Sequence, residues 1–192
     1  MLREFVVVSA FCLFLRPLNC QLCQDVRTFD FRNATIQIAP QDEGSRQGSQ
    51  SFALRNGIAF TSNDPDSLKS HDWRVDLLVN RTVHLDSRTW ASVIVLEKDH
   101  LTGTGTWGYV LAFGCENGVL VRLFQNSSQG VILKHLTGSE IELYEPSWKV
   151  GDAHCCPSAH RELVYRWKPN EHRFQSMSST TEDGFESKPN ER

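Results

Sequence analysis

The chain has 192 residues, of which 40% are hydrophobic and 10% are aromatic. This length accommodates one domain, and the apolar content is enough to bury a core, which excludes a wholly disordered chain. The formal net charge is −3, which argues against nucleic acid and anionic membrane surfaces as partners, because both attract basic proteins.

The N-terminus has the pattern of an export signal. Arg3 precedes an uninterrupted apolar run over residues 5–15, and Pro17 follows it. The run has the length of the central region of a signal peptide and is shorter than the roughly 20 apolar residues that cross a membrane. We therefore predict that residues 1–20 are a signal peptide, that the protein is periplasmic or secreted, and that no transmembrane helix remains after signal removal. A buried helix at the start of the domain is the alternative interpretation.

Export sets the expected chemistry of the cysteines. A lipid on Cys20 or Cys23 is a less favoured alternative, because the residues before each of them fit a lipoprotein signal poorly. Four of the six cysteines remain when the signal region is set aside. An even number in an oxidising compartment indicates disulfides, with about three connectivities open for four cysteines. The four are Cys23, Cys115, Cys155 and Cys156.

Alternation of apolar and polar residues predicts antiparallel strands in one domain, residues 24–175. Along residues 73–85, the odd-numbered apolar residues are expected to share one face of a strand, with Asn80 and Thr82 on the other face. Residues 90–96 form a continuous apolar run, which is typical of a central strand buried on both faces. The run is thus expected at the centre of the sheet.

Turn residues predict how these strands are connected. The pairs Asn56-Gly57 and Asn117-Gly118 are each flanked by apolar runs and predict tight hairpins, because both central residues of such a turn need positive φ. A further hairpin is expected around Thr137-Gly138, and alternation over residues 163–167 predicts a last strand.

Helix and disorder are expected to be minor. Residues 64–70 have the capping and proline pattern of one short helix. Residues 176–192 are rich in Ser, Thr, Glu, Lys and Pro and are predicted to form a disordered tail. The predicted fold is therefore mainly β, antiparallel, hairpin-rich and disulfide-stabilised, or α+β if one or two short helices form.

One segment resembles a known family. Residues 151–158 read Gly-Asp-Ala-His-Cys-Cys-Pro-Ser, and residues 163–167 read Leu-Val-Tyr-Arg-Trp. This resembles the G-x-D-x-x-C-C-P-[ST] element, followed by a V-x-Y-x-[LW] strand, of a family of small exported bacterial proteins that has no established activity. Some members are labelled as lipoproteins. The resemblance covers about residues 70–175, and it implies a bacterial envelope or periplasmic protein.

The resemblance does not carry over a calcium site. Many members of the family place an acidic turn, similar to calcium-binding loops, before the central strand. This chain has Asp86 there as a lone carboxylate, whereas calcium takes several oxygen ligands.

The adjacent cysteines of that element favour pairing with a third cysteine. Neighbouring Cα atoms lie about 3.8 Å apart, below the roughly 4.4–6.8 Å of an unstrained disulfide. We therefore expect at least one of Cys155 and Cys156 to pair with Cys115. Metal binding is the weaker alternative, because adjacent cysteines cannot easily bind one ion and export favours disulfides over thiolates. Its candidate ligands are Asp152, His154, Cys155, Cys156 and His160.

The tryptophans and the Asn-x-Ser/Thr triplets are further features of the sequence. Trp148 lies in a loop, where it either covers a disulfide or presents an apolar surface to a ligand, and the other four tryptophans are expected in the core: Trp73, Trp90, Trp107 and Trp167. The triplets are N-glycan acceptors in a eukaryotic secretory pathway, whereas the bacterial resemblance implies that they are silent. They begin at Asn33, Asn80 and Asn126.

The sequence shows no catalytic motif of the G-x-S-x-G or H-E-x-x-H type. We therefore expect a non-catalytic envelope or secreted protein that binds an unknown protein, glycan or surface and carries no cofactor. One alternative is a metal- or redox-active site at His154-Cys155-Cys156. The other is a hydrolase of a type that its motifs do not reveal.

The export signal predicts the N-terminus of the mature protein. The exported chain should begin at or near Gln21, because the apolar run ends before Pro17 and Cys20 is small enough for the last position of a cleavage site. Intact mass and N-terminal sequencing of exported protein check this. A mature species that starts at Met1 would contradict it.

Overall fold

The computed structural model describes residues 21–40, 49–61, 72–102, 105–153 and 156–183. The predicted signal peptide and the short helix expected at residues 64–70 lie outside these ranges. Within them the chain is mainly β and every strand pairing is antiparallel, as predicted. The only helical elements in the described ranges are the 3₁₀ turns η1 (Val26–Thr28), η2 (Phe31–Asn33) and η3 (Pro169–Glu171).

The described strands form three sheets. A five-stranded sheet has the order β3-β4-β5-β6-β7, a four-stranded sheet has the order β11-β10-β9-β8, and β1 pairs with β2. The bounds are β1 Thr35–Ile38, β2 Gln50–Ala53, β3 Ile58–Thr61, β4 Trp73–His84, β5 Trp90–His100, β6 Thr106–Glu116, β7 Val119–Gln129, β8 Ile132–Leu136, β9 Glu140–Ser147, β10 Ala159–Lys168 and β11 Arg173–Asp183.

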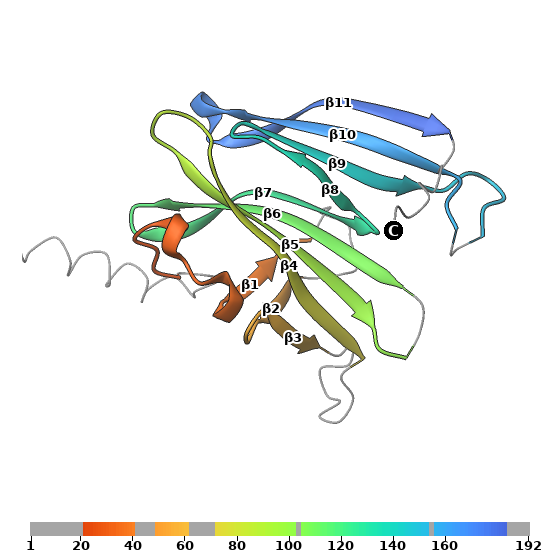
Figure 1. Ribbon diagram of the computed structural model, residues 1–192, viewed down its shortest axis with the longest axis horizontal. Helices are drawn as coiled ribbons and strands as arrows, with labels where there is room; N and C mark the ends of the chain where they lie inside the picture. The colour runs from red at the N-terminus through yellow and green to blue at the C-terminus, as the bar shows by residue number, and fades with distance from the viewer. Residues whose placement is uncertain (1–20, 41–48, 62–71, 103–104, 154–155, 184–192) are drawn as a thin grey trace, which may run out of the picture.

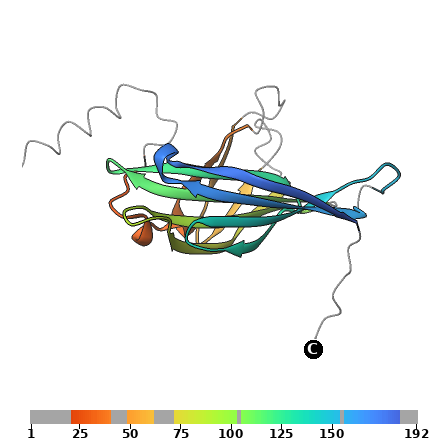
Figure 2. The ribbon, with the colours of Figure 1, turned by 90° about the horizontal axis from the view of Figure 1, so that it is seen from above.

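The five-stranded sheet is the middle layer (Figures 1 and 2). Its first face packs against the N-terminal segment, in a core that includes Phe31, Ile36 and Phe52. Its second face packs against the four-stranded sheet, in a core that includes Leu143 and Trp167. We call the layer formed by residues 21–40 and β2 the N-terminal layer.

Strand β5 confirms the prediction of a central strand buried on both faces. Ile94 and Leu96 belong to the core under the N-terminal layer. Val93 and Val95 belong to the core under the four-stranded sheet. Because successive side chains of a strand point to opposite faces, a continuous apolar run is what this position requires.

A β-bulge at Leu78 overturns the predicted faces of β4. Leu77 lies opposite Leu96 and Val79 lies opposite Val95, so Leu78 is an extra residue with no partner on β5. Before the bulge, Val75 packs under the N-terminal layer, whereas Val79 packs under the four-stranded sheet. An extra residue shifts the alternation by one position. The odd-numbered apolar residues therefore occupy both faces of the sheet rather than one.

Both Asn-Gly pairs form tight turns, but only one of them joins paired strands. Asn117 and Gly118 have φ of 51° and 79° and connect β6 to β7, as predicted. Asn56 and Gly57 have φ of 54° and 87°. The strands on either side of this second turn separate, because β2 pairs with β1 and β3 pairs with β4.

The C-terminal strand corrects the expectation of a disordered tail over residues 176–183, whereas residues 184–192 of that predicted tail lie outside the described residues. Residues 176–183 belong to β11, which pairs with β10 along its whole length, from Lys168 opposite Arg173 to Ala159 opposite Asp183. The polar composition of this segment reflects an edge strand whose side chains, apart from the buried Phe174, are exposed over residues 173–181. Low apolar content therefore indicated solvent contact here and not disorder.

The bulge makes deletion of Leu78 a test of the strand register. Because Leu78 has no partner and its side chain is 55% exposed, its removal should close the bulge, keep every β4–β5 pair and change the free energy of unfolding by about 1 kcal/mol or less. Chemical denaturation measures the change.

A regular strand with all odd-numbered residues on one face requires a damaging Leu78 deletion instead, because removal of any residue would then turn the rest of β4 to the wrong face.

Candidate functional site

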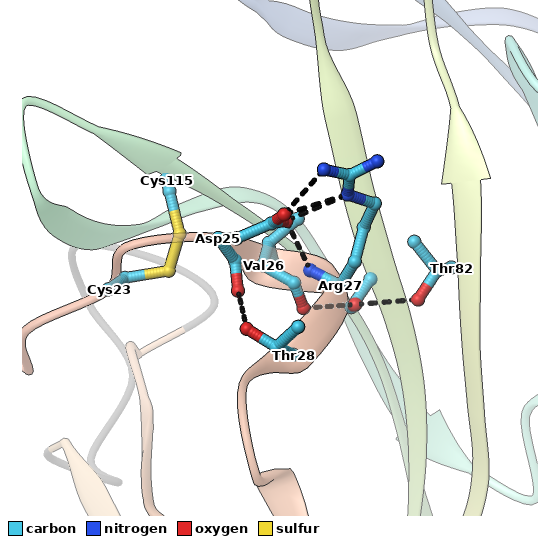
Figure 3. The surroundings of a disulfide bond; sticks show 8 residues. Cys23, Asp25, Val26, Arg27, Thr28, Thr82 and Cys115 are labelled. Atoms are coloured by element: carbon cyan, nitrogen blue, oxygen red, sulfur yellow. Dashed lines mark hydrogen bonds and ion pairs between the residues drawn. A yellow bond between two sulfur atoms is a disulfide. The ribbon is translucent and has the colours of Figure 1, made fainter.

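A disulfide fastens the N-terminal layer to the middle sheet. Cys23 and Cys115 are joined, with their Cα atoms 5.6 Å apart (Figure 3). The chain before β1 runs beside the start of β7, where the Cys23 N–H donates to the Gly118 carbonyl over 2.9 Å and Leu22 bridges Val119. This path places Cys23 beside the β6–β7 hairpin.

The pairing corrects the expectation that Cys115 bonds to Cys155 or Cys156. Ring strain at the adjacent pair favours a third cysteine as a partner, but the path of the N-terminal segment, which brings Cys23 to the β6–β7 hairpin, decides which cysteine Cys115 meets. Cys156 is also in a disulfide, with a partner outside the described residues. His154 and Cys155 lie outside the described residues.

The residues considered for a metal site have other roles where the structure describes them. Asp152 Oδ2 accepts hydrogen bonds from the Lys149 N–H, the Ser158 N–H and the Ser158 hydroxyl, over 2.7, 2.9 and 3.0 Å. These bonds lower the pKa of Asp152 and close the β9–β10 loop. His160 lies edge-on to Tyr144, with ring centroids 4.9 Å apart. Among the described residues no group of three His, Cys, Asp or Glu side chains can hold a metal ion.

A pocket of about 370 Å³ opens beside the Cys23–Cys115 disulfide. Residues from four separate connections line it: the segment that includes η1, the β4–β5 turn, the β6–β7 hairpin and the β10–β11 turn. Ten of the lining residues lie in these connections or at the strand ends next to them: Gln24, Asp25, Val26, Arg27, Arg88, Thr89, Trp90, Cys115, Glu116 and His172. We call it the disulfide-end pocket.

One side of this pocket is a stack of flat groups. The Arg27 guanidinium lies over the Trp90 ring, 5.1 Å from its centroid, and the His84 ring stacks on Trp90 at 4.5 Å. The Arg27 side chain also binds both carboxylate oxygens of Asp25 (Figure 3). This bond is the largest cause of the lowered pKa of Asp25. Arg27 is thus neutralised and held in place.

Two further nitrogen-bearing side chains, those of His172 and Arg88, lie on the pocket wall. His172 has φ of 49° at the β10–β11 turn, and its Nδ1 lies 3.6 Å from Glu116 Oε1. Arg88 is exposed, and its guanidinium makes no hydrogen bond or ion pair with any described residue. Arg88 is therefore a cation of the pocket lining that has no ion-pair partner among the described residues.

Asp86 shapes the turn that carries Arg88. Its Oδ1 accepts from the Arg88 and Thr89 N–H groups, both over 2.9 Å. Its Oδ2 accepts from Nε1 of Trp167, over 2.7 Å. Burial raises the pKa of Asp86, but the hydrogen bonds together outweigh burial and lower it. The Asp86 carboxylate thus ties the β4–β5 turn to β10 of the other sheet.

A second hollow, of about 390 Å³, lies between β1 and the start of β7. Its cation, Arg122, donates to the Gln37 carbonyl over 3.0 Å, and burial lowers the pKa of Arg122. Because this guanidinium already binds the N-terminal layer, the disulfide-end pocket is the better candidate for a ligand.

The tryptophan predictions were partly wrong. Trp167 is buried, as predicted, and Trp107 packs against the core under the N-terminal layer. Trp90 was expected in the core, but it is 39% exposed and lines the pocket. Trp148, at the start of the β9–β10 loop, is 37% exposed.

Sequence reasoning did not identify the pocket. Its charged residues lie in four turns that are distant along the chain, and each turn by itself has an ordinary polar composition. The one local signal was the position of Trp90 at the first residue of a strand, next to a polar turn.

No family model, curated protein or solved structure matches the chain. Within the described residues, no helix has the length and apolar character needed to cross a membrane.

The Asp86 bonds predict an effect on stability. In Asp86→Asn, the amide NH₂ group faces a donor in either orientation, the backbone N–H groups or Nε1 of the buried Trp167. The free energy of unfolding at neutral pH should fall by about 1–3 kcal/mol. Chemical denaturation measures it, and the loss should shrink in a Trp167→Phe background, which lacks the donor. Equal losses in both backgrounds would contradict the cross-sheet bond.

The lowered pKa of Asp86 also predicts a dependence on pH. Its contribution is fully present above the unfolded-state value of about 3.9 and is lost as pH falls through the lower folded-state pKa. Below about pH 4 the wild-type protein should therefore lose stability more steeply than Asp86→Asn. Parallel slopes would show that the folded-state pKa is not lowered.

Proposed function

We propose that the protein is an exported, non-catalytic binding module, and that the disulfide-end pocket takes an anionic group of its ligand. Export is supported by the pattern of residues 1–20 together with the Cys23–Cys115 disulfide, since disulfides form and persist in oxidising compartments. The chemistry recognised is a carboxylate or sulfate, carried by a glycan or by an acidic peptide.

The unpartnered guanidinium of Arg88 carries this proposal. A guanidinium presents donors in a planar fork that matches a carboxylate or sulfate. The Asp86 bonds to the Arg88 and Thr89 N–H groups hold the backbone of the turn, so the point from which the Arg88 side chain extends is fixed before a ligand arrives. Preorganisation of this kind reduces the entropy cost of binding.

The other polar groups of the pocket support binding rather than bond cleavage. Asp25 is paired with Arg27, and Glu116 lies beside His172. The metal-site alternative is not favoured, because Cys156 is in a disulfide and a disulfide sulfur offers no thiolate to a metal ion.

Replacement of Arg88 tests the proposal. In Arg88→Gln, the affinity for an anionic probe should fall about tenfold or more. This is the change in affinity expected when one charge-assisted hydrogen bond is lost. The probes are sodium glucuronate, a heparin tetrasaccharide and a glutamate-rich peptide, titrated by calorimetry at low salt. The probe that binds most tightly identifies the source of the anionic group.

Arg81→Gln is the matched control, because Arg81 is an exposed arginine of the same hairpin, outside the pocket lining, and has no partner among the described residues. Its removal changes net charge equally but should leave affinity unaltered. Equal losses in both variants would mean that net charge, and not the pocket, attracts the probe. No measurable binding of any probe to the wild-type protein would reject the proposed function.

A further inference from the structure

The three Asn-x-Ser/Thr triplets differ sharply in their surroundings. They begin at Asn33, Asn80 and Asn126, and the sequence alone does not distinguish them. An N-glycan is bulky and hydrophilic, so the folded protein must leave its asparagine open to solvent.

Asn126 lies between the two large sheets. It is two residues after Phe124 on β7, and Phe124 packs against Tyr165 and Phe174 of the four-stranded sheet. The Asn126 amide nitrogen donates to the Tyr165 hydroxyl over 3.3 Å, and its amide oxygen is buried. A glycan on this nitrogen would have to occupy the interface between the sheets, so a chain modified there could not close the sandwich.

Asn33 is exposed, but its amide holds two segments together. Its nitrogen donates to Asp30 Oδ2 over 2.8 Å, and its oxygen accepts from the Asn56 N–H over 3.0 Å. The second bond fixes the Asn56-Gly57 turn against η2. A sugar on the nitrogen would crowd Asp30 and disturb the bond between Asn33 and the Asn56 N–H.

Asn80 has neither restriction. It is exposed on β4, and its side chain makes no hydrogen bond with any described residue. Thr82 follows two residues later, so both side chains of the triplet stand on the same face of the strand. Thr82 is also exposed, with its hydroxyl 3.2 Å from that of Ser92.

The outer edge of β4 has no partner strand among the described residues at this point. Strand β3 pairs only with Trp73–Asp76, so from Leu78 to His84 no described strand covers that edge. Leu78, beside Asn80 on this edge, is 55% exposed. An uncovered strand edge with an exposed apolar residue is a site for unwanted pairing with other chains. A hydrophilic glycan at Asn80 would cover it.

We propose that Asn80 is the N-glycan acceptor of this protein. The donor is an oligosaccharide linked through a diphosphate to a membrane lipid. The Asn80 amide nitrogen forms a bond to the anomeric carbon of the first sugar, the bond from that carbon to the diphosphate oxygen breaks, and the amide proton is released as the lipid diphosphate leaves. The modification rests on the proposed export, into a secretory pathway that holds this donor rather than into the bacterial envelope that the resemblance implied, and not on the pocket.

Expression of the full chain in a mammalian secretory system tests this proposal. Glycosidase release followed by mass spectrometry locates the site, because a released N-glycan leaves Asp in place of Asn. We expect one glycan, at Asn80. It should be absent in Asn80→Gln and Thr82→Ala and retained in Thr82→Ser, which keeps the hydroxyl. The two Thr82 variants keep Asn80 itself, so any effect of the Gln substitution on folding does not decide the result.

A second version of the chain separates this proposal from export. In it, a signal peptide of known activity replaces residues 1–20, so that the domain enters the secretory pathway in either case. A glycan at Asn80 in this version alone would uphold the acceptor and reject the export signal. A secreted protein without a glycan at Asn80, or with its only glycan at Asn33 or Asn126, would overturn the proposal.

Discussion

Strands β5 and β6 are apolar on both faces, and the other layers of the molecule exist to cover them. Leu111 of β6 is buried under the N-terminal layer and Val110 is buried under the four-stranded sheet. Neither cover alone would remove both faces from water, and each exposed apolar side chain would cost about 1.5–3 kcal/mol. The N-terminal segment is therefore part of the core rather than an appendage, which explains why a disulfide and backbone hydrogen bonds fasten it to the β6–β7 hairpin.

Local features of the sequence predicted most of the fold. The continuous apolar run of β5, the alternation along β10 and the Asn117-Gly118 turn each contain their own structural information, because side-chain period and positive φ are properties of a few neighbouring residues. What the sequence did not show depends on residues far apart. The bulge at Leu78 arises because β4 must contribute to both cores, and the partner of Cys115 depends on where the N-terminal segment crosses the sheet.

The disulfide-end pocket is also a feature that depends on residues far apart in the sequence. Its wall combines Arg27, Arg88 and His172, from three connections that meet only when all the layers have assembled. The bond between Asp86 and Trp167 then links the turn that bears Arg88 to the opposite sheet. A ligand held by Arg88 would therefore be sensitive to how the two sheets are packed, and a change in that packing would alter binding without touching the pocket itself.

The Cys23–Cys115 bond joins residues separated by 92 positions, and this has a consequence for biosynthesis. Because a ribosome makes the chain from its N-terminus, Cys23 is present long before Cys115 and before Val119 of β7, which Leu22 bridges. During that interval the Cys23 thiol has no native partner, and the apolar side chains of the N-terminal layer have no sheet to cover. The domain cannot be completed before the β6–β7 hairpin is present. Until then, a wrong disulfide at Cys23, or binding of the N-terminal segment to another chain, would prevent the native fold.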